Sequence, residues 1–218
     1  MKLILGDKAY STWSLRPWLV LKRCGADFDE VMVPLNRPDT AEAIARHAPA
    51  GKVPALEVDG VTIWDSLAIA LWAEERFPDV ALWPADAKAR WVARAAVCEM
   101  HSAFGTLRGE LGMAPDHPMC VVQDEAHAPS EALSADIRRM IALWKDAKSR
   151  FGRGGPFLFG DWSVADAFFT PVAARFRHFR IDLNAHGDDG TAAAYMDALL
   201  SQPDFLEWED AGRAELAA

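Results

Sequence analysis

Residues 51–66 of this chain are GKVPALEVDGVTIWDS. Because Pro54 cannot donate a backbone hydrogen bond, this stretch predicts a sheet edge or a cis turn rather than a central strand. A cis bond there would leave the amide and carbonyl of Val53 facing outward, where an extended peptide can pair with them as an added strand. Asp65-Ser66 then opens a helix whose free N–H groups favour a carboxylate. The stretch therefore predicts an edge that binds a small extended peptide.

Strand and helix signals alternate around this stretch. The predicted strands are residues 2–5, 28–33, 55–58 and 61–63, and the predicted helices are residues 14–25, 40–47 and 67–77. Asp59-Gly60 lies between the last two strands and is a strong signal for a hairpin with a type I′ turn. The order β-α-β-α-β-β-α predicts a small α/β domain over residues 1–80.

Strand signals disappear after the proline-bearing segment 78–84, and helical periodicity replaces them. Apolar residues repeat at intervals of three and four from residue 93 to residue 111, which predicts one long helix. The same spacing over residues 137–151 predicts a second helix. An all-helical domain is therefore predicted over residues 86–218.

Two further signals organise the helical domain. Ser163 and Asp166 form a capping-box pattern, in which the Asp166 carboxylate reaches back to the amide of Ser163, and they predict the start of a third helix. Residues 113–130 carry three prolines and predict a loop or an irregular helix start.

Composition and charge limit the class of protein. The chain has 218 residues, of which 51% are hydrophobic and 25% charged, as is ordinary for a soluble globular protein. A net charge of −9 argues against a nucleic-acid or anionic-membrane partner, since both need a basic face. No apolar run approaches the ~20 residues that a membrane span requires. Residues 1–6 are too short an apolar stretch for a signal peptide, so the predicted location is cytoplasmic.

The cysteines give no sign of a metal site or a redox motif. Cys24, Cys98 and Cys120 are widely spaced and make no C-x-x-C or zinc pattern. His117 and His127 lie near Cys120 along the chain, but their spacing fits no standard zinc site. Reduced, buried thiols and no bound metal are therefore predicted.

Three motifs in this layout resemble the glutathione transferase superfamily. They are Val53-Pro54, Asp65-Ser66 with the following Ala68-Ile69, and GDWSVAD at residues 160–166. The segment YSTWSLRPWL, residues 10–19, looks like the start of the first helix in a bacterial, serine-type, zeta-like branch. The resemblance covers nearly the whole chain. It implies a thioredoxin-like domain that binds glutathione, followed by a helical domain that holds the pocket for a second substrate.

The resemblance also implies an enzyme that presents the thiol of glutathione as a thiolate. A free thiol has a pKa of about 8.5, and lowering it by about two units requires about 2.7 kcal/mol of preferential anion binding. A hydroxyl donor and the positive end of the first helix are suited to supply this. By offset from Pro17, the resemblance favours Ser11 as the donor, with Ser14 and Thr12 as rivals.

Further residues are implied to hold the tripeptide. The backbone of Val53, beside Pro54, would pair with the cysteinyl part, while Asp65 and Ser66 would take the γ-glutamyl amine and carboxylate. Lys52 would meet the glycyl carboxylate. Family members more often have Glu or Gln where this chain has Asp65, and the shorter Asp65 side chain reaches less far.

The leading hypothesis is a cytosolic, homodimeric glutathione transferase. It would attack small hydrophobic electrophiles or reduce hydroperoxides, as in detoxification, with glutathione as co-substrate. A zeta-like glutathione-dependent isomerase is one alternative, although the zeta motif has a cysteine where residues 10–19 have none. A non-catalytic binding module of the same fold is another, because Ser11, Thr12 and Ser14 are also frequent helix caps, and Asp65-Ser66 can cap a helix with no ligand present.

Overall fold

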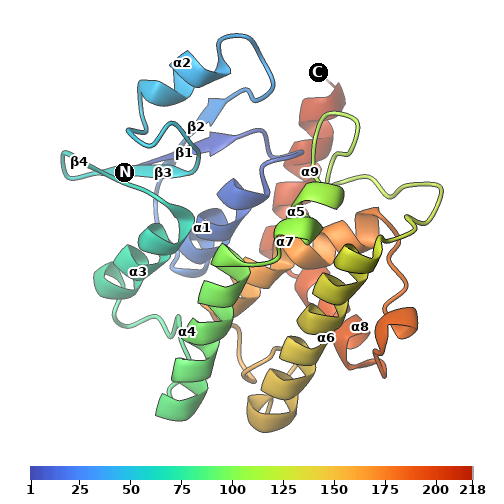
Figure 1. Ribbon diagram of the computed structural model, residues 1–218. Helices are drawn as coiled ribbons and strands as arrows, with labels where there is room; N and C mark the ends of the chain where they lie inside the picture. Colours follow the sequence, from blue (N-terminus) through green and yellow to red (C-terminus); the bar gives the residue numbers. More distant parts are fainter. Residues whose placement is uncertain (218) are drawn as a thin grey trace. The chain divides into compact units, whose positions relative to one another are not determined.

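The alternating strands of the N-terminal part pair as one mixed sheet in this computed structural model, which describes residues 1–217 (Figure 1). Within those residues four strands lie in the order β2-β1-β3-β4. The strands are β1 (Lys2–Gly6), β2 (Asp29–Val33), β3 (Ala55–Val58) and β4 (Val61–Ile63). β1 runs parallel to β2 and antiparallel to β3, and β3 pairs antiparallel with β4. The predicted strands are confirmed to within one residue at each end.

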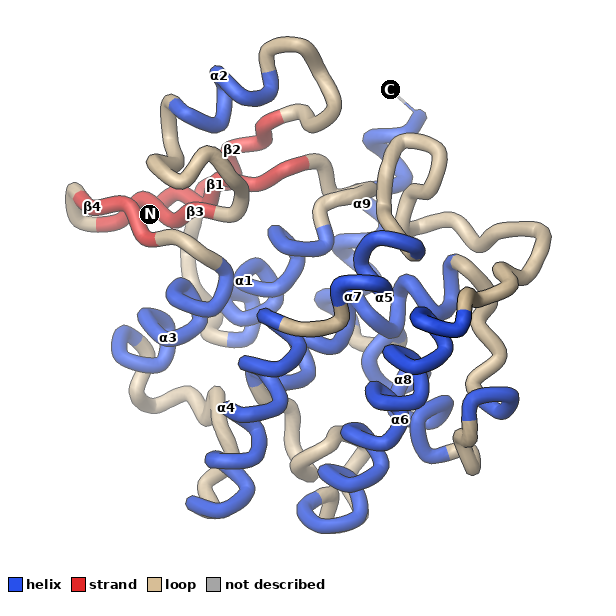
Figure 2. Tube along the Cα trace, viewed as in Figure 1, coloured by secondary structure: helices blue, strands red, loops and turns tan. Residues whose placement is uncertain are grey.

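Helices cover both faces of this sheet (Figure 2). They are α1 (Thr12–Arg23), α2 (Thr40–Ala45) and α3 (Ser66–Arg76). Because successive strand side chains face opposite ways, Ile4 packs toward α2 with Ile44, while its buried neighbours Leu3 and Leu5 face the opposite side of the sheet. The predicted β-α-β-α-β-β-α order and the thioredoxin-like fold of this part are therefore confirmed.

Pro54 stands immediately before β3. The Val53–Pro54 peptide bond is cis, as one of the two predictions for this position required. The other prediction, a sheet edge, is wrong, since β3 pairs with β1 on one side and β4 on the other. Asp59 and Gly60 have φ values of 50° and 79°. A type I′ turn requires a positive φ at both of its central residues, so these values agree with the predicted turn.

The rest of the described chain is helical, as predicted. The elements are α4 (Ala87–Ser102), α5 (Gly105–Glu110), α6 (Glu131–Phe151), α7 (Val164–His178), the 3₁₀ turn η1 (Asn184–His186), α8 (Thr191–Leu200) and α9 (Pro203–Ala217). The structure divides into two compact units. One comprises residues 1–80, 113–120 and 207–217, and the other comprises residues 81–112 and 121–206.

The single long helix predicted over residues 93–111 is wrong, because α4 and α5 are separate. Phe104 adopts the left-handed conformation, with φ of 58°, between the two helices. The amide of Leu107, in the first turn of α5, donates to Asp136 Oδ2 of α6 at 2.9 Å, and the Arg108 guanidinium donates to the Ala103 carbonyl. The apolar spacing hides this break, since Phe104 and Leu107 are both buried.

The capping box that predicted α7 is present. The amide of Ser163 donates to Asp166 Oδ2 at 2.7 Å, and the hydroxyl of Tyr195 in α8 donates to Asp166 Oδ1, also at 2.7 Å. The Tyr195 ring in turn meets Trp144 of α6 edge-on, with ring centroids 5.1 Å apart. Asp166 therefore joins the start of α7 to the packed aromatic core of its unit.

Residues 113–130 contain no helix, which confirms the predicted loop. Across the described chain, every helix is too short or too polar to pass through a lipid bilayer.

Candidate functional site

Three hydroxyl side chains lie at the start of α1. Ser11 occupies the N-cap position, Thr12 is the first helical residue, and both are buried along with Ser14. The Ser11 side chain makes no capping hydrogen bond to the helix. Its hydroxyl instead donates to Ser14 Oγ at 2.7 Å, and Ser14 Oγ also accepts from the amide of Gly6 at 3.1 Å. The N-cap interpretation of Ser11 therefore explains its position but not the direction of its hydroxyl.

The start of α1 favours an anion beside Ser11. The first amides of α1 point out of the helix and carry its positive partial charge. Burial, and then the charges of Asp7 and Glu215, raises the pKa of Tyr10, which precedes Ser11.

The segment before β3 presents backbone rather than side-chain groups. Val53 is half-buried, Pro54 is buried, and Lys52 is exposed. Among residues 1–217, no hydrogen bond reaches the amide or carbonyl of Val53. This arrangement suits pairing with the backbone of a bound peptide.

Asp65 and Ser66 lie where α3 begins. Asp65 is the N-cap, and its Oδ1 accepts from the amides of Leu67 at 3.0 Å and Ala68 at 3.4 Å. Ser66 is fully buried, yet within the described residues its Oγ has no hydrogen-bond partner. An unsatisfied buried hydroxyl costs roughly 1–3 kcal/mol, so Ser66 is the polar group here that gains most from a ligand.

The structure brings the predicted residues into one unit. α1 packs against α3. The hydroxyl groups at the start of α1 and Asp65-Ser66 at the start of α3 therefore belong to neighbouring helices. A second cis bond, between Trp64 and Asp65, precedes the α3 cap, and no local sequence pattern predicts it.

Two arginines of the second unit form a feature that sequence reasoning missed. Arg175 of α7 is buried and donates from Nε to the carbonyl of Leu111 at 3.0 Å. Burial, and then the neighbouring charge of Arg108, lowers the pKa of Arg175 to about 10. Repulsion between two cations is relieved by an anionic group beside them. Their separation along the chain left no local pattern to find.

Apolar side chains on either side of the break between α4 and α5 belong to the core of the second unit. Met100, Phe104 and Leu107 are all buried there. No three His, Cys, Asp or Glu side chains gather as a metal-binding group anywhere in residues 1–217.

Comparison with known proteins gives consistent matches. A family model described as the glutathione S-transferase N-terminal domain matches residues 10–76. A probable maleylacetoacetate isomerase of Caenorhabditis elegans is 29% identical over 181 residues, which cover 80% of this chain and 78% of that protein. A maleylpyruvate isomerase of Ralstonia sp. is 28% identical over 198 residues, which cover 82% of this chain and 86% of that protein. A solved sphingomonad glutathione S-transferase complexed with glutathione has a TM-score of 0.68 and 25% identity, covering 98% of this chain and 99% of that chain.

Proposed function

Because this chain belongs to the glutathione transferase superfamily and has zeta-like relatives, we propose that it is a glutathione-dependent enzyme. The main support for this proposal is the position of Ser11. It lies at the N-terminus of α1, and its hydroxyl donates to Ser14 instead of capping the helix. A hydroxyl in that place can donate to a sulfur anion, and the helix start stabilises the same charge.

The serine pair suggests how the hydroxyl serves the thiolate. The Gly6 amide holds Ser14 Oγ as an acceptor, and hydroxyl hydrogens rotate freely. When glutathione binds, the Ser14 hydrogen can turn toward Ser11 Oγ, and the Ser11 hydrogen can then turn toward the sulfur. Ser14 therefore supports Ser11, which remains the proposed donor, and Thr12 remains the rival nearest in sequence.

The tripeptide would be held by groups of the same unit. The backbone of Val53 pairs with the cysteinyl residue beside the cis bond to Pro54, and Ser66 receives the γ-glutamyl carboxylate. Asp65 keeps Oδ1 on the helix cap, while its negative charge attracts the γ-glutamyl amine. Lys52, being exposed, is the proposed partner of the glycyl carboxylate.

We expect Ser66→Ala to weaken glutathione binding about 10- to 100-fold, the loss of one hydrogen bond to a charged group worth roughly 1.5–3 kcal/mol. Titration calorimetry measures this change. The ligand-free variant should unfold at the same temperature as the parent or higher, because the change removes an unsatisfied buried hydroxyl. Ser149→Ala, on the exposed surface of α6, is the matched control. Unchanged affinity in Ser66→Ala would remove this residue from the site.

The reaction is proposed as attack of the thiolate on a soft electrophile, or reduction of an organic hydroperoxide. A second candidate is isomerisation of an anionic unsaturated substrate, and Arg108 and Arg175 are the observation that favours it. The names of the two isomerase relatives agree with that candidate. An assay with a cis-dienoic acid and one with a neutral aryl halide separate the two reactions.

For the isomerase candidate, Arg108→Ala should raise the KM for a cis-dienoic acid about 10- to 100-fold, since an ionic hydrogen bond is worth roughly 1.5–3 kcal/mol. Turnover of a neutral electrophile should stay within about twofold of the parent. Arg138→Ala is the control, because Arg138 pairs with Glu131 on the exposed surface of α6. Equal loss on both substrates would show that Arg108 acts on the fold and not on the acid.

If the protein is instead a non-catalytic binding module, we expect no binding of glutathione. No heat on titration with millimolar glutathione would favour a binding module that has lost the thiol chemistry. A homodimer in the cytoplasm remains part of the proposal, and sedimentation of the purified protein tests the dimer.

A further inference from the structure

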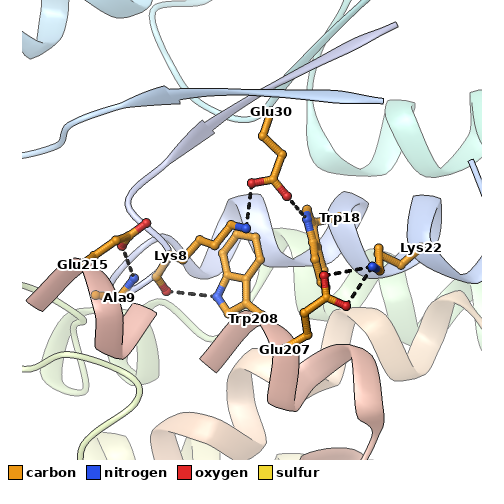
Figure 3. Close-up of polar contacts among 8 residues, drawn as sticks. All are labelled: Lys8, Ala9, Trp18, Lys22, Glu30, Glu207, Trp208 and Glu215. Carbon is orange, nitrogen blue, oxygen red and sulfur yellow. Dashed lines mark hydrogen bonds and ion pairs between the residues drawn. The ribbon is translucent and has the colours of Figure 1, made fainter. Parts of the chain in front are cut away.

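The C-terminal half of α9, residues 207–217, lies against the turn that joins β1 to α1 (Figure 3). That turn, residues 7–11, ends at Ser11. Trp208, Gly212 and Glu215 follow one another at spacings of four and three, which places them on one face of the helix. All three contact the turn.

Hydrogen bonds fix the backbone of the turn two residues before Ser11. Trp208 Nε1 donates to the carbonyl of Lys8 at 2.9 Å. The amide of Ala9 donates to Glu215 Oε2 at 3.0 Å, and the carbonyl of Ala9 accepts from the amide of Met119 at 2.7 Å. Because Ala9 is fully buried, losing Glu215 or Met119 leaves a backbone group of Ala9 unsatisfied.

Gly212 lets the helix approach this closely. A Cβ atom at residue 212 would lie 3.1 Å from the amide nitrogen of Ala9 and 3.2 Å from its Cα. The neighbouring backbone would have to move by a few tenths of an ångström to admit it. The absence of a side chain at this position therefore sets the distance between α9 and the turn.

The Lys8 side chain anchors the same turn to α1, α9 and β2. Its ammonium lies 2.6 Å from Glu30 Oε2 of β2 and 5.3 Å from the ring centroids of both Trp18 and Trp208 (Figure 3). Trp18 Nε1 also donates to Glu30, at 2.6 Å. A cation between two indole rings and a carboxylate is held firmly because each contact limits the side chain from a different direction.

We propose that the C-terminal half of α9 positions the turn that places the Ser11 hydroxyl, with Glu215 and Trp208 as positioning residues. This inference rests on the proposed function, because the consequence of misplacing Ser11 is loss of thiol ionisation. Glu215 sets the Ala9 peptide, Gly212 sets the approach of the helix, and the Ser11–Ser14 pair transmits the position to the bound sulfur.

The test measures the pKa of the thiol of bound glutathione by ultraviolet absorbance, together with kcat. Glu215→Ala should lower kcat about tenfold and raise the thiol pKa by about one unit, since the two changes correspond to the same free energy. Glu215→Gln should recover most of the loss, because its amide oxygen still accepts from Ala9. Asp210→Ala removes a carboxylate from the same helix that pairs only locally with Arg213, and should match the parent.

Gly212→Ala perturbs the same turn without removing a hydrogen bond. Alanine improves the helix by about 1 kcal/mol over glycine, so a fall in kcat with a raised thiol pKa cannot come from a weaker α9. If the parent ionises bound glutathione and both Glu215→Ala and Gly212→Ala ionise it equally well, the positioning role is wrong. If the parent itself leaves the thiol at its ordinary pKa, the proposed function fails first.

Discussion

Asp166→Ala should destabilise the protein by roughly 2–4 kcal/mol, the sum of a lost helix cap and unsatisfied buried donors. Asp166 is fully buried and accepts from the Ser163 amide and the Tyr195 hydroxyl. Alanine accepts from neither. Chemical denaturation followed by tryptophan fluorescence measures the loss in the free energy of unfolding. Tyr195→Phe should lose only the share of that free energy that one hydrogen bond contributes.

The cost of this substitution should depend on pH. Burial raises the pKa of Asp166 from 3.8 to about 6, against the lowering effect of its hydrogen bonds to Tyr195 and Ser163. Because the folded-state pKa lies above the ordinary value, the stability that Asp166 contributes is complete below 3.8 and is lost as pH rises through about 6. The Asp166→Ala penalty should therefore be larger at about pH 5 than at about pH 8. A penalty that grows with pH would contradict this.

Ser11→Ala should lower turnover about 10- to 100-fold, since a hydrogen bond to an anion is worth roughly 1.5–3 kcal/mol. The affinity for glutathione should change little, because Val53, Asp65 and Ser66 would hold the tripeptide at other points. The expected pattern is a fall in kcat with the dissociation constant of glutathione retained.

Substitutions of the neighbouring hydroxyl residues show which hydroxyl donates to the thiolate. Ser14→Ala should cost less than Ser11→Ala, as Ser14 acts through Ser11, and part of its effect should appear as lower stability because the Gly6 amide loses its acceptor. Thr12→Ala should be near the parent. Full activity in Ser11→Ala with loss in Thr12→Ala or Ser14→Ala would mean that the donor was wrongly assigned.

Local signals account for the parts of the fold that sequence reasoning found. The hairpin at Asp59-Gly60, the cap at Asp65 and the box at Ser163 each depend on residues within four positions of one another. Turn and cap chemistry acts over that range, and alternation of apolar and polar side chains marks the strands. The positions of the candidate residues at helix starts and before a strand were predictable for the same reason, while their roles remain a proposal.

Features that depend on distant residues were not predictable. Trp208 meets the carbonyl of Lys8 across 200 positions of sequence, and no local pattern marks that contact. The break at Phe104 depends on Asp136 of another helix, whereas the apolar spacing simply continues through it. The proximity of Arg108 and Arg175 likewise exists only once the helices have packed.

The most direct measurement is a pH titration of glutathione bound to the parent protein, with thiolate followed by ultraviolet absorbance. We expect a thiol pKa about two units below the ordinary value of about 8.5, and a return most of the way to that value in Ser11→Ala. Glutathione that binds with its ordinary thiol pKa, or does not bind at all, would contradict the proposed role of Ser11.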